Sequence, residues 1–288
     1  MSGFAERRWT SPDGLALYAR DYAADGGERR LPVLCLHGFT RNSADFEDLA
    51  PVIAASGRRV VAIDMRGRGR SDHDPRPANY HPRVYARDVL GFLSGLGIPR
   101  AVFIGTSMGG LITMTVALLR AHVIAGAILN DVGPAVDPAG IRRIQSYAGK
   151  ARPVTNWEEA VDYVRSTYQA AWPEFGADDW ERIARRTFRD GPEGPVLDYD
   201  PAIAAAAKPA GRLASLIAWL AFRRLAQRVP TLLIRGERSD ILSAGIAARM
   251  QRQAPGLEVV VVPVVGHAPT LSEPEARAAI EAFLASVR

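Results

Sequence analysis

The sequence predicts an α/β fold in which a mostly parallel, eight-stranded sheet carries helices on both faces. Three observations lead to this prediction. From Leu31 onward, short apolar runs alternate with longer amphipathic runs, a pattern typical of parallel strands joined by crossover helices. The apolar runs are nearly continuous, as in strands that are covered on both faces. Before them, residues 4–22 form two alternating runs joined by Ser11-Pro12-Asp13-Gly14, which predicts an N-terminal antiparallel hairpin.

After the hairpin, the apolar runs predict six further strands, at residues 33–36, 60–64, 101–105, 124–130, 231–235 and 259–263. Helical periodicity indicates helices at residues 44–56, 84–96, 108–120, 243–253 and 273–288. Gly57 and Gly97 directly follow the first two of these helices, where glycine commonly ends a helix.

Residues 134–210 interrupt this alternation, because they show helical patterns and no convincing strand. They are expected to form a helical cap, or lid, inserted after the sixth strand. The core would then consist of residues 1–133 and 211–288. The aromatic residues of the insertion are expected mainly to pack it against the core.

The composition fits a globular protein, with 288 residues, 48% hydrophobic and 23% charged. The formal charge of +5 comes almost entirely from arginine, since only Lys150 and Lys208 are lysines. These arginines are dispersed along the sequence, which argues against a nucleic-acid or membrane partner. The single cysteine, Cys35, lies in an apolar strand and is read as a buried hydrophobe. With no secretory signal and no apolar run of membrane-spanning length, a cytoplasmic protein without a membrane partner is expected.

The segment Gly105-Thr106-Ser107-Met108-Gly109-Gly110 lies between a predicted strand and a predicted helix. In that context, G-x-S-x-G describes a sharp corner with serine at its apex. The glycines on either side allow strand and helix to approach closely. The corner would expose the hydroxyl of Ser107 and place the backbone N–H of Met108 beside it, where it could stabilise an oxyanion.

The loop after the first parallel strand, Leu36-His37-Gly38-Phe39, could supply a second such amide. A bend at Gly38 would let the N–H of Phe39 face the same cavity as that of Met108. His37 is expected to hold the loop through its ring hydrogen bonds. The glycine- and arginine-rich loop at residues 64–72 contains no nucleotide-binding motif and is read as a structural turn.

Two further loops follow predicted strands at the same edge of the sheet and contain Asp240 and His267. Serine at its ordinary pKa is a poor nucleophile, so a neutral imidazole must accept its proton. A carboxylate then orients the imidazole and stabilises its protonated form. Ser107, Asp240 and His267 occur in the chain order nucleophile, acid, base. No group of residues has metal-ligand spacing, and no cofactor is expected.

These motifs together resemble the α/β-hydrolase superfamily with a helical cap domain, and they extend over nearly the whole chain. The resemblance implies Ser107 as nucleophile, His267 as base and Asp240 as acid, with the amides of Phe39 and Met108 as the oxyanion hole. Asp131, at the end of the strand at residues 124–130, is the alternative acid, because some relatives place their carboxylate there.

The resemblance favours a serine esterase that cleaves a carboxylic ester or lactone of a small, largely apolar substrate through an acyl-enzyme on Ser107. One alternative is a C–C bond hydrolase of a ring-cleavage product, in which cap arginines such as Arg142, Arg143 or Arg165 bind a substrate carboxylate. A ligand receptor or a cofactor-free oxygenase is a further alternative. The partner is expected to be a small-molecule substrate, and the protein a monomer or homodimer.

Overall fold

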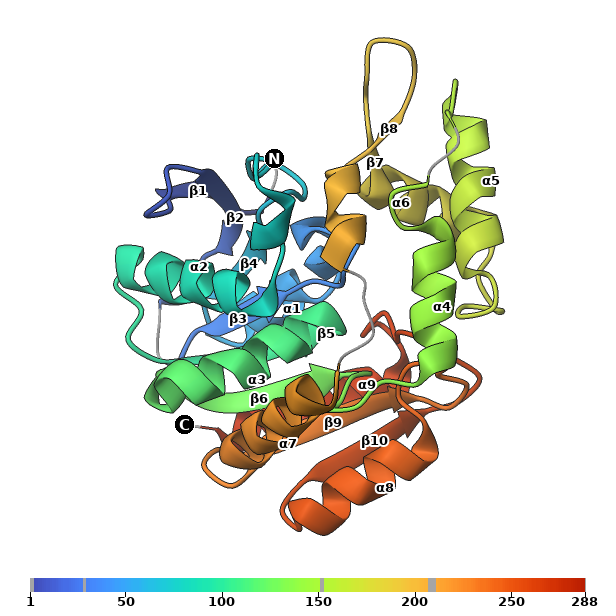
Figure 1. Cartoon of the computed structure of the whole chain (residues 1–288). Coiled ribbons are helices and arrows are strands. Elements are labelled where there is room, and N and C mark those ends of the chain that lie inside the picture. Colours follow the sequence, from blue (N-terminus) through green and yellow to red (C-terminus); the bar gives the residue numbers. More distant parts are fainter. Residues whose placement is uncertain (1–2, 28–29, 151–152, 207–210, 288) are drawn as a thin grey trace.

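The computed structural model describes residues 3–27, 30–150, 153–206 and 211–287. Its main sheet has eight strands in the order β1-β2-β4-β3-β5-β6-β9-β10 (Figure 1). Strands β1 and β2 pair antiparallel, as do β2 and β4, and all other neighbours in the sheet are parallel. The predicted sheet and N-terminal hairpin are therefore confirmed. The strands of this sheet are β1 (Ala5–Thr10), β2 (Ala16–Tyr22), β3 (Val33–Leu36), β4 (Val60–Asp64), β5 (Ala101–Thr106), β6 (Ile124–Asn130), β9 (Thr231–Gly236) and β10 (Glu258–Val262).

Helices cover both faces of the sheet. One face packs against α1 and α9, and the other packs against α2, α3, α7 and α8, which lie side by side in Figure 1. The described α-helices are α1 (Ala50–Ala55), α2 (Pro82–Gly95), α3 (Met108–Arg120), α4 (Pro138–Tyr147), α5 (Trp157–Tyr168), α6 (Ala177–Thr187), α7 (Arg212–Ala226), α8 (Ala244–Gln253) and α9 (Pro274–Ser286). Short 3₁₀ helices are η1 (Ser43–Phe46), η2 (Pro77–Asn79), η3 (Ala121–Val123) and η4 (Pro201–Ala206). No helix in the described ranges is both long and apolar enough to cross a bilayer.

The helix predicted at residues 44–56 is divided into η1 and α1. Pro51 lies in the first turn of α1, where its missing N–H costs nothing, but a longer helix through this point would lose a hydrogen bond. The side chain of Asn42 accepts a hydrogen bond from the N–H of Ala44 and starts η1 separately. For the other predicted strands and helices, most ends lie within one or two residues of those in the structure.

The chain between β6 and α7 contains α4, α5 and α6, which lie beyond the carboxyl ends of the parallel strands (Figure 1). The prediction that it contains no strand is wrong, because β7 (Phe188–Arg189) and β8 (Val196–Leu197) form a short antiparallel pair. Two residues per strand leave no hydrophobic alternation to detect. The aromatic residues form a separate small core in which Tyr168, Trp172, Phe175 and Trp180 contact one another.

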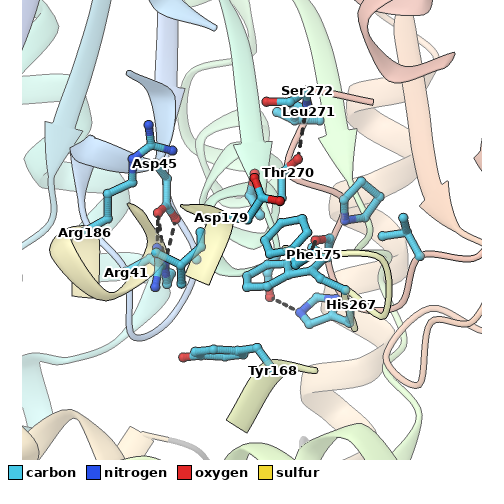
Figure 2. A pocket seen from close by; sticks show the side chains of 18 of the residues that line it. Arg41, Asp45, Tyr168, Phe175, Asp179, Arg186, His267, Thr270, Leu271 and Ser272 are labelled. Atoms are coloured by element: carbon cyan, nitrogen blue, oxygen red, sulfur yellow. Dashed lines mark hydrogen bonds and ion pairs between the residues drawn. The ribbon is translucent and has the colours of Figure 1, made fainter. Parts of the chain in front are cut away.

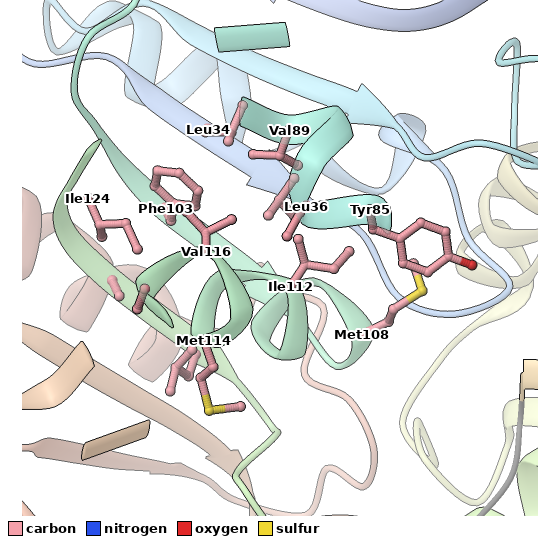
Figure 3. Packing of buried hydrophobic residues seen from close by; sticks show 14 of the residues in the cluster. Leu34, Leu36, Tyr85, Val89, Phe103, Met108, Ile112, Met114, Val116 and Ile124 are labelled. Carbon is pink, nitrogen blue, oxygen red and sulfur yellow. The ribbon is translucent and has the colours of Figure 1, made fainter. Parts of the chain in front are cut away.

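Helix α3 packs at the centre of the larger core. Ile112 and Val116 on α3 are buried near Leu36 and Phe103 of the sheet, as Figure 3 shows. The first turn of α3 lies especially close to the strands. A Cβ atom at Gly109 would lie 2.0 Å from the carbonyl oxygen of Leu36, and one at Gly105 would lie 2.5 Å from the backbone of Gly109. Glycine at both positions is therefore required for the helix to sit this close.

Replacing Gly109 by alanine is expected to lower the free energy of unfolding by about 3 kcal/mol, because its methyl group must push α3 away from β3. Gly245→Ala, in α8, is the matched control. A Cβ there has no neighbour closer than 4.0 Å, and the change is expected to be neutral or to stabilise by about 0.5 kcal/mol. Urea unfolding of both variants makes the comparison, and equal stability for the two would contradict this description of the contact.

Candidate active site

Ser107 lies at the corner between β5 and α3, as the motif predicts. Its backbone has φ of 51° and ψ of −112°, a left-handed conformation that is unusual for a residue with a side chain. The Ser107 N–H donates to the carbonyl of Asn130, and the N–H groups of Gly110 and Leu111 donate to the Ser107 carbonyl. These bonds and the close packing of Gly105 and Gly109 hold the strained corner in place.

His267 follows β10 and meets Ser107 directly. Its Nε2 lies 2.9 Å from the Oγ of Ser107, and its Nδ1 lies 2.7 Å from Oδ2 of Asp131. A carboxylate can only accept a hydrogen bond, so the neutral ring must carry its proton on Nδ1. Nε2 is then free to accept a hydrogen bond from the serine hydroxyl. The prediction that these two side chains meet at one edge of the sheet agrees with this geometry.

Asp131, the alternative acid of the sequence analysis, is the carboxylate that contacts His267. It directly follows β6, is fully buried and has a left-handed φ of 55°. Oδ1 accepts a hydrogen bond from the N–H of Gly236 at 3.0 Å, and Oδ2 accepts one from the Ser239 hydroxyl at 2.6 Å in addition to the imidazole. Ser239, a residue that no sequence motif singled out, therefore helps to hold this carboxylate.

The prediction that Asp240 contacts the imidazole needs correction. Its two carboxylate oxygens accept hydrogen bonds at 2.6 and 2.8 Å from the guanidinium of Arg143, on α4. Partial burial of Asp240 favours a higher pKa, but the hydrogen bond and the charge of Arg143 outweigh it and lower the pKa of this carboxyl. Both aspartates follow neighbouring strands, and their partners distinguish them: Ser239 and His267 bind Asp131, whereas Arg143 binds Asp240.

The two backbone amides predicted to form the oxyanion hole belong to segments that lie next to Ser107. Met108 begins α3, where N–H groups have no partner within the helix, and Phe39 follows Gly38 in the loop after β3. Among the described residues, neither N–H donates to another protein group. A Cβ at Gly38 would lie 4.0 Å from the Cβ of Ser107, so this loop runs past the serine at van der Waals distance.

His37 holds this loop, as predicted. Its Nδ1 lies 2.8 Å from the carbonyl oxygen of Gly38, and its Nε2 accepts from the N–H of Met65 at 3.0 Å. This arrangement requires Nδ1–H and an unprotonated Nε2. Complete burial lowers the pKa of His37 to about 4, which keeps the ring neutral.

Arg68, within the predicted structural turn at residues 64–72, contacts both Phe39 and Met108. Its guanidinium donates to the carbonyl of Phe39 at 3.0 Å and to the hydroxyl of Tyr85 at 2.8 Å, and it lies 3.6 Å from the sulfur of Met108. It is fully buried. No carboxylate of the described residues forms an ion pair with it, and the rings of Phe39, Tyr80 and Tyr85 surround the charge instead.

A cavity of about 320 Å³ opens in front of the serine and imidazole. Figure 2 shows aromatic side chains, including Phe175 and Tyr168, near His267 and a charged group, including Arg41, Asp45 and Arg186, farther away. Arg41 pairs with Asp45 and Thr187, and Arg186 pairs with Asp48. The cavity therefore has an apolar part beside the reactive groups and a polar part at a distance from them.

The segment after α5 is bound to the loop that holds His267. The indole N–H of Trp172 donates to the carbonyl of Ala268 at 2.8 Å, and the N–H of Gly266 donates to the carbonyl of Ala171 at the same distance. The segment between α5 and α6 therefore fixes the position of the imidazole loop, and residues of both helices line the cavity.

The neutrality of His37 predicts a loss of stability in acid. An unfolded imidazole has a pKa near 6.5, so as the pH falls toward 4 the unfolded state gains its proton before the folded state does. Between pH 7 and pH 4.5 this is expected to lower the free energy of unfolding by about 2 kcal/mol. Asp64, whose buried carboxyl has a pKa raised to about 6, works in the opposite direction, so a variant is needed to separate the two.

Urea unfolding of wild type and His37→Asn at both pH values isolates the imidazole contribution. The variant is expected to lose about 2 kcal/mol less than wild type on acidification. Identical pH profiles for the two proteins would contradict the assigned ring state.

Comparison with known proteins agrees with this geometry. Residues 33–280 match the alpha/beta hydrolase family. A 3-hydroxybutyrate-oligomer hydrolase of Cupriavidus necator is 32% identical over 92% of this chain and 91% of its own length. A 2-(acetamidomethylene)succinate hydrolase of Mesorhizobium japonicum is 28% identical over 82% of this chain and 81% of its own. The crystal structure of an alpha/beta hydrolase from Novosphingobium aromaticivorans superimposes with a TM-score of 0.91 at 44% identity, covering 99% of both chains. The chain belongs to the α/β hydrolase family, and it is a hydrolase.

Proposed function

We propose that this hydrolase cleaves carboxylic esters through an acyl-enzyme on Ser107. The observation that carries this proposal is the continuous hydrogen-bond chain from the Ser107 hydroxyl through His267 to the buried carboxylate of Asp131. Each member supplies one requirement of nucleophilic acyl transfer: a hydroxyl on a residue that lines the cavity, a neutral base and a group that orients the base.

In the first half of the reaction, the Ser107 oxygen attacks the ester carbonyl carbon while its proton moves to Nε2 of His267. Asp131 stabilises the imidazolium that results. The carbonyl oxygen becomes negatively charged, and the N–H groups of Phe39 and Met108 are the donors assigned to it. When the tetrahedral intermediate collapses, the bond to the alcohol oxygen breaks and the imidazolium returns its proton to that oxygen.

In the second half, a water molecule replaces the alcohol. His267 removes one proton from this water as it attacks the acyl carbon, and the ester bond to Ser107 then breaks. The serine recovers its proton from the imidazolium, and the product acid leaves. The buried charge of Arg68, which contacts Phe39 and Met108, adds a positive potential on the side where the oxyanion forms.

The cavity supports a substrate that is apolar near the scissile bond and polar at its far end. Aromatic side chains lie near Ser107 and His267, and the charged group around Arg41 and Asp45 lies farther away. The relative from Cupriavidus necator is named for hydrolysis of 3-hydroxybutyrate oligomers, whose units are joined by ester bonds. Short hydroxyacyl oligoesters are therefore the first substrates to test, beside simple acyl esters and lactones.

The arrangement of cap arginines gives less support to C–C bond hydrolysis. Of the three arginines considered for binding a substrate carboxylate, Arg143 pairs with Asp240 and Arg165 with Asp162. Neither they nor Arg142 are among the residues that line the cavity. A ring-cleavage substrate is kept as one member of the substrate panel.

Ser107→Ala is expected to reduce ester turnover by about three orders of magnitude or more, because it removes the nucleophile and leaves binding intact. The measurement is hydrolysis of p-nitrophenyl esters of increasing chain length and of 3-hydroxybutyrate oligomers. Labelling by a fluorophosphonate probe, in wild type and not in the variant, is the control for the reactive serine. Wild-type turnover in the folded variant would refute the acyl-enzyme, and failure of the probe to label wild type would favour a receptor or an oxygenase.

Asp131→Asn is expected to reduce kcat by about 10³ to 10⁴, because an amide at this position favours the wrong imidazole tautomer. Asp240→Asn, the matched control, should leave kcat nearly unchanged, because it breaks an ion pair at the edge of α4. Steady-state kinetics on one p-nitrophenyl ester makes the comparison. A large loss in Asp240→Asn with little loss in Asp131→Asn would restore Asp240 as the acid.

A further inference from the structure

Four helices on one face of the sheet carry exposed arginines and no exposed acidic side chain. The helices on this face are α2, α3, α7 and α8, whose inner sides share the larger core (Figure 1). The only acidic residue on these four helices is Asp88, which is buried and bound by the guanidinium of Arg66. The exposed arginines on and beside them are Arg83, Arg87, Arg120, Arg223, Arg224, Arg228, Arg249 and Arg252. Among the described residues, none of these eight forms an ion pair with a carboxylate.

An apolar stripe crosses the same face. Leu213 and Leu216 on α7 are 71% and 69% exposed, and Ile217 and Leu220 continue the stripe one and two turns along. Their spacing places all four side chains on one side of the helix. Leu119, at the end of the adjacent helix α3, is also exposed.

The opposite side of α7 packs against the larger core. Trp219, Phe222 and Leu225 are buried there, and the guanidinium of Arg249 on α8 lies 4.0 Å from the Trp219 ring centroid. Helix α7 therefore has two apolar sides, of which only one has a partner within the protein. Isolated exposed apolar residues are ordinary, but a helical stripe of large aliphatic residues indicates an interaction site.

We propose that this α7 surface, meaning the apolar stripe together with the eight arginines on the same face, docks on the headgroup layer of an anionic phospholipid bilayer. The interface of such a bilayer binds a surface that combines exposed aliphatic side chains with arginines and has no exposed acidic side chain on the same helices. Leucine and isoleucine side chains would enter the acyl boundary, and the guanidinium groups would pair with lipid phosphates.

Two other occupants fit the surface less well. A second copy would bring arginines against arginines, because positive side chains lie near the C-terminal end of α7 and on its neighbours on both sides. Nucleic acid would pair with the arginines but would leave four large aliphatic side chains against a polar backbone. The charge and the apolar stripe together favour lipid.

Docking by this surface leaves the candidate active site free, because α7 contributes no residue to the cavity. Docking on a bilayer differs from the expectation of no membrane partner, which rested on the dispersal of arginine along the sequence. The fold brings eight of the dispersed arginines together on one face.

The test is co-sedimentation of the full chain with vesicles of phosphatidylcholine alone or with about one third phosphatidylglycerol, at about 0.1 M salt. We expect binding to the anionic vesicles and much weaker binding to the neutral ones, with a decrease as salt rises. Equal binding to both kinds, or none to either, would overturn the proposal.

Two variants locate the surface. Leu213→Ser/Leu216→Ser is expected to weaken vesicle binding about tenfold or more, because it removes apolar side chains that would enter the bilayer. Arg223→Gln/Arg224→Gln is expected to weaken it about thirtyfold, from the loss of two charges near the lipid surface. The matched controls are Val52→Ser, an exposed aliphatic residue on α1 of the opposite face, and Arg165→Gln/Arg185→Gln on α5 and α6.

Both α7 variants should retain wild-type hydrolysis of a soluble ester, which shows that they are folded. Vesicle binding that is unchanged in them, or equally reduced in the controls, would overturn the proposal. A dimer in analytical ultracentrifugation that Leu213→Ser/Leu216→Ser converts to monomer, without vesicle binding by wild type, would assign the surface to a second copy. Binding to duplex DNA in place of vesicles would likewise contradict the lipid assignment.

Discussion

The contact between Gly109 and the carbonyl of Leu36 determines how the reactive groups are arranged. With no side chain at this position, the first turn of α3 rests on β3, and Ser107 is held at a left-handed corner between strand and helix. The same contact brings the loop after β3, with Gly38 and Phe39, beside the serine. One backbone approach therefore positions the hydroxyl and both candidate oxyanion donors. The imidazole and carboxylate, in contrast, come from loops that other parts of the chain fix.

Local sequence was enough to identify the residues whose positions depend on local geometry. Ser107 lies in a strand-turn-helix motif, His267 directly follows the last strand, and His37 precedes a glycine bend. The acid could not be chosen in this way, because Asp131 and Asp240 both follow neighbouring strands. The structure distinguishes them through residues distant in sequence: Ser239 and His267 bind Asp131, whereas Arg143 binds Asp240.

The distribution of surface charge could not be predicted from local sequence either. Arginines spaced widely along the chain come together on α2, α3, α7 and α8 because the topology places these four helices on one face of the sheet. The sequence of α7 has apolar residues on two sides of the helix, and its periodicity does not distinguish the side that packs on the core from the side that is exposed. Likewise, the cavity depends on how α5 and α6 pack over the sheet, so the polar group around Arg41 was not foreseen.

The most direct test of the proposed catalytic arrangement is a crystal structure of the enzyme inactivated by an alkyl phosphonate. The phosphorus should be bonded to the Ser107 Oγ, and one phosphonyl oxygen should lie about 2.7–3.1 Å from the backbone nitrogens of both Phe39 and Met108. His267 should remain hydrogen-bonded to Asp131. An adduct on another residue, or a phosphonyl oxygen that faces away from both amides, would contradict the account.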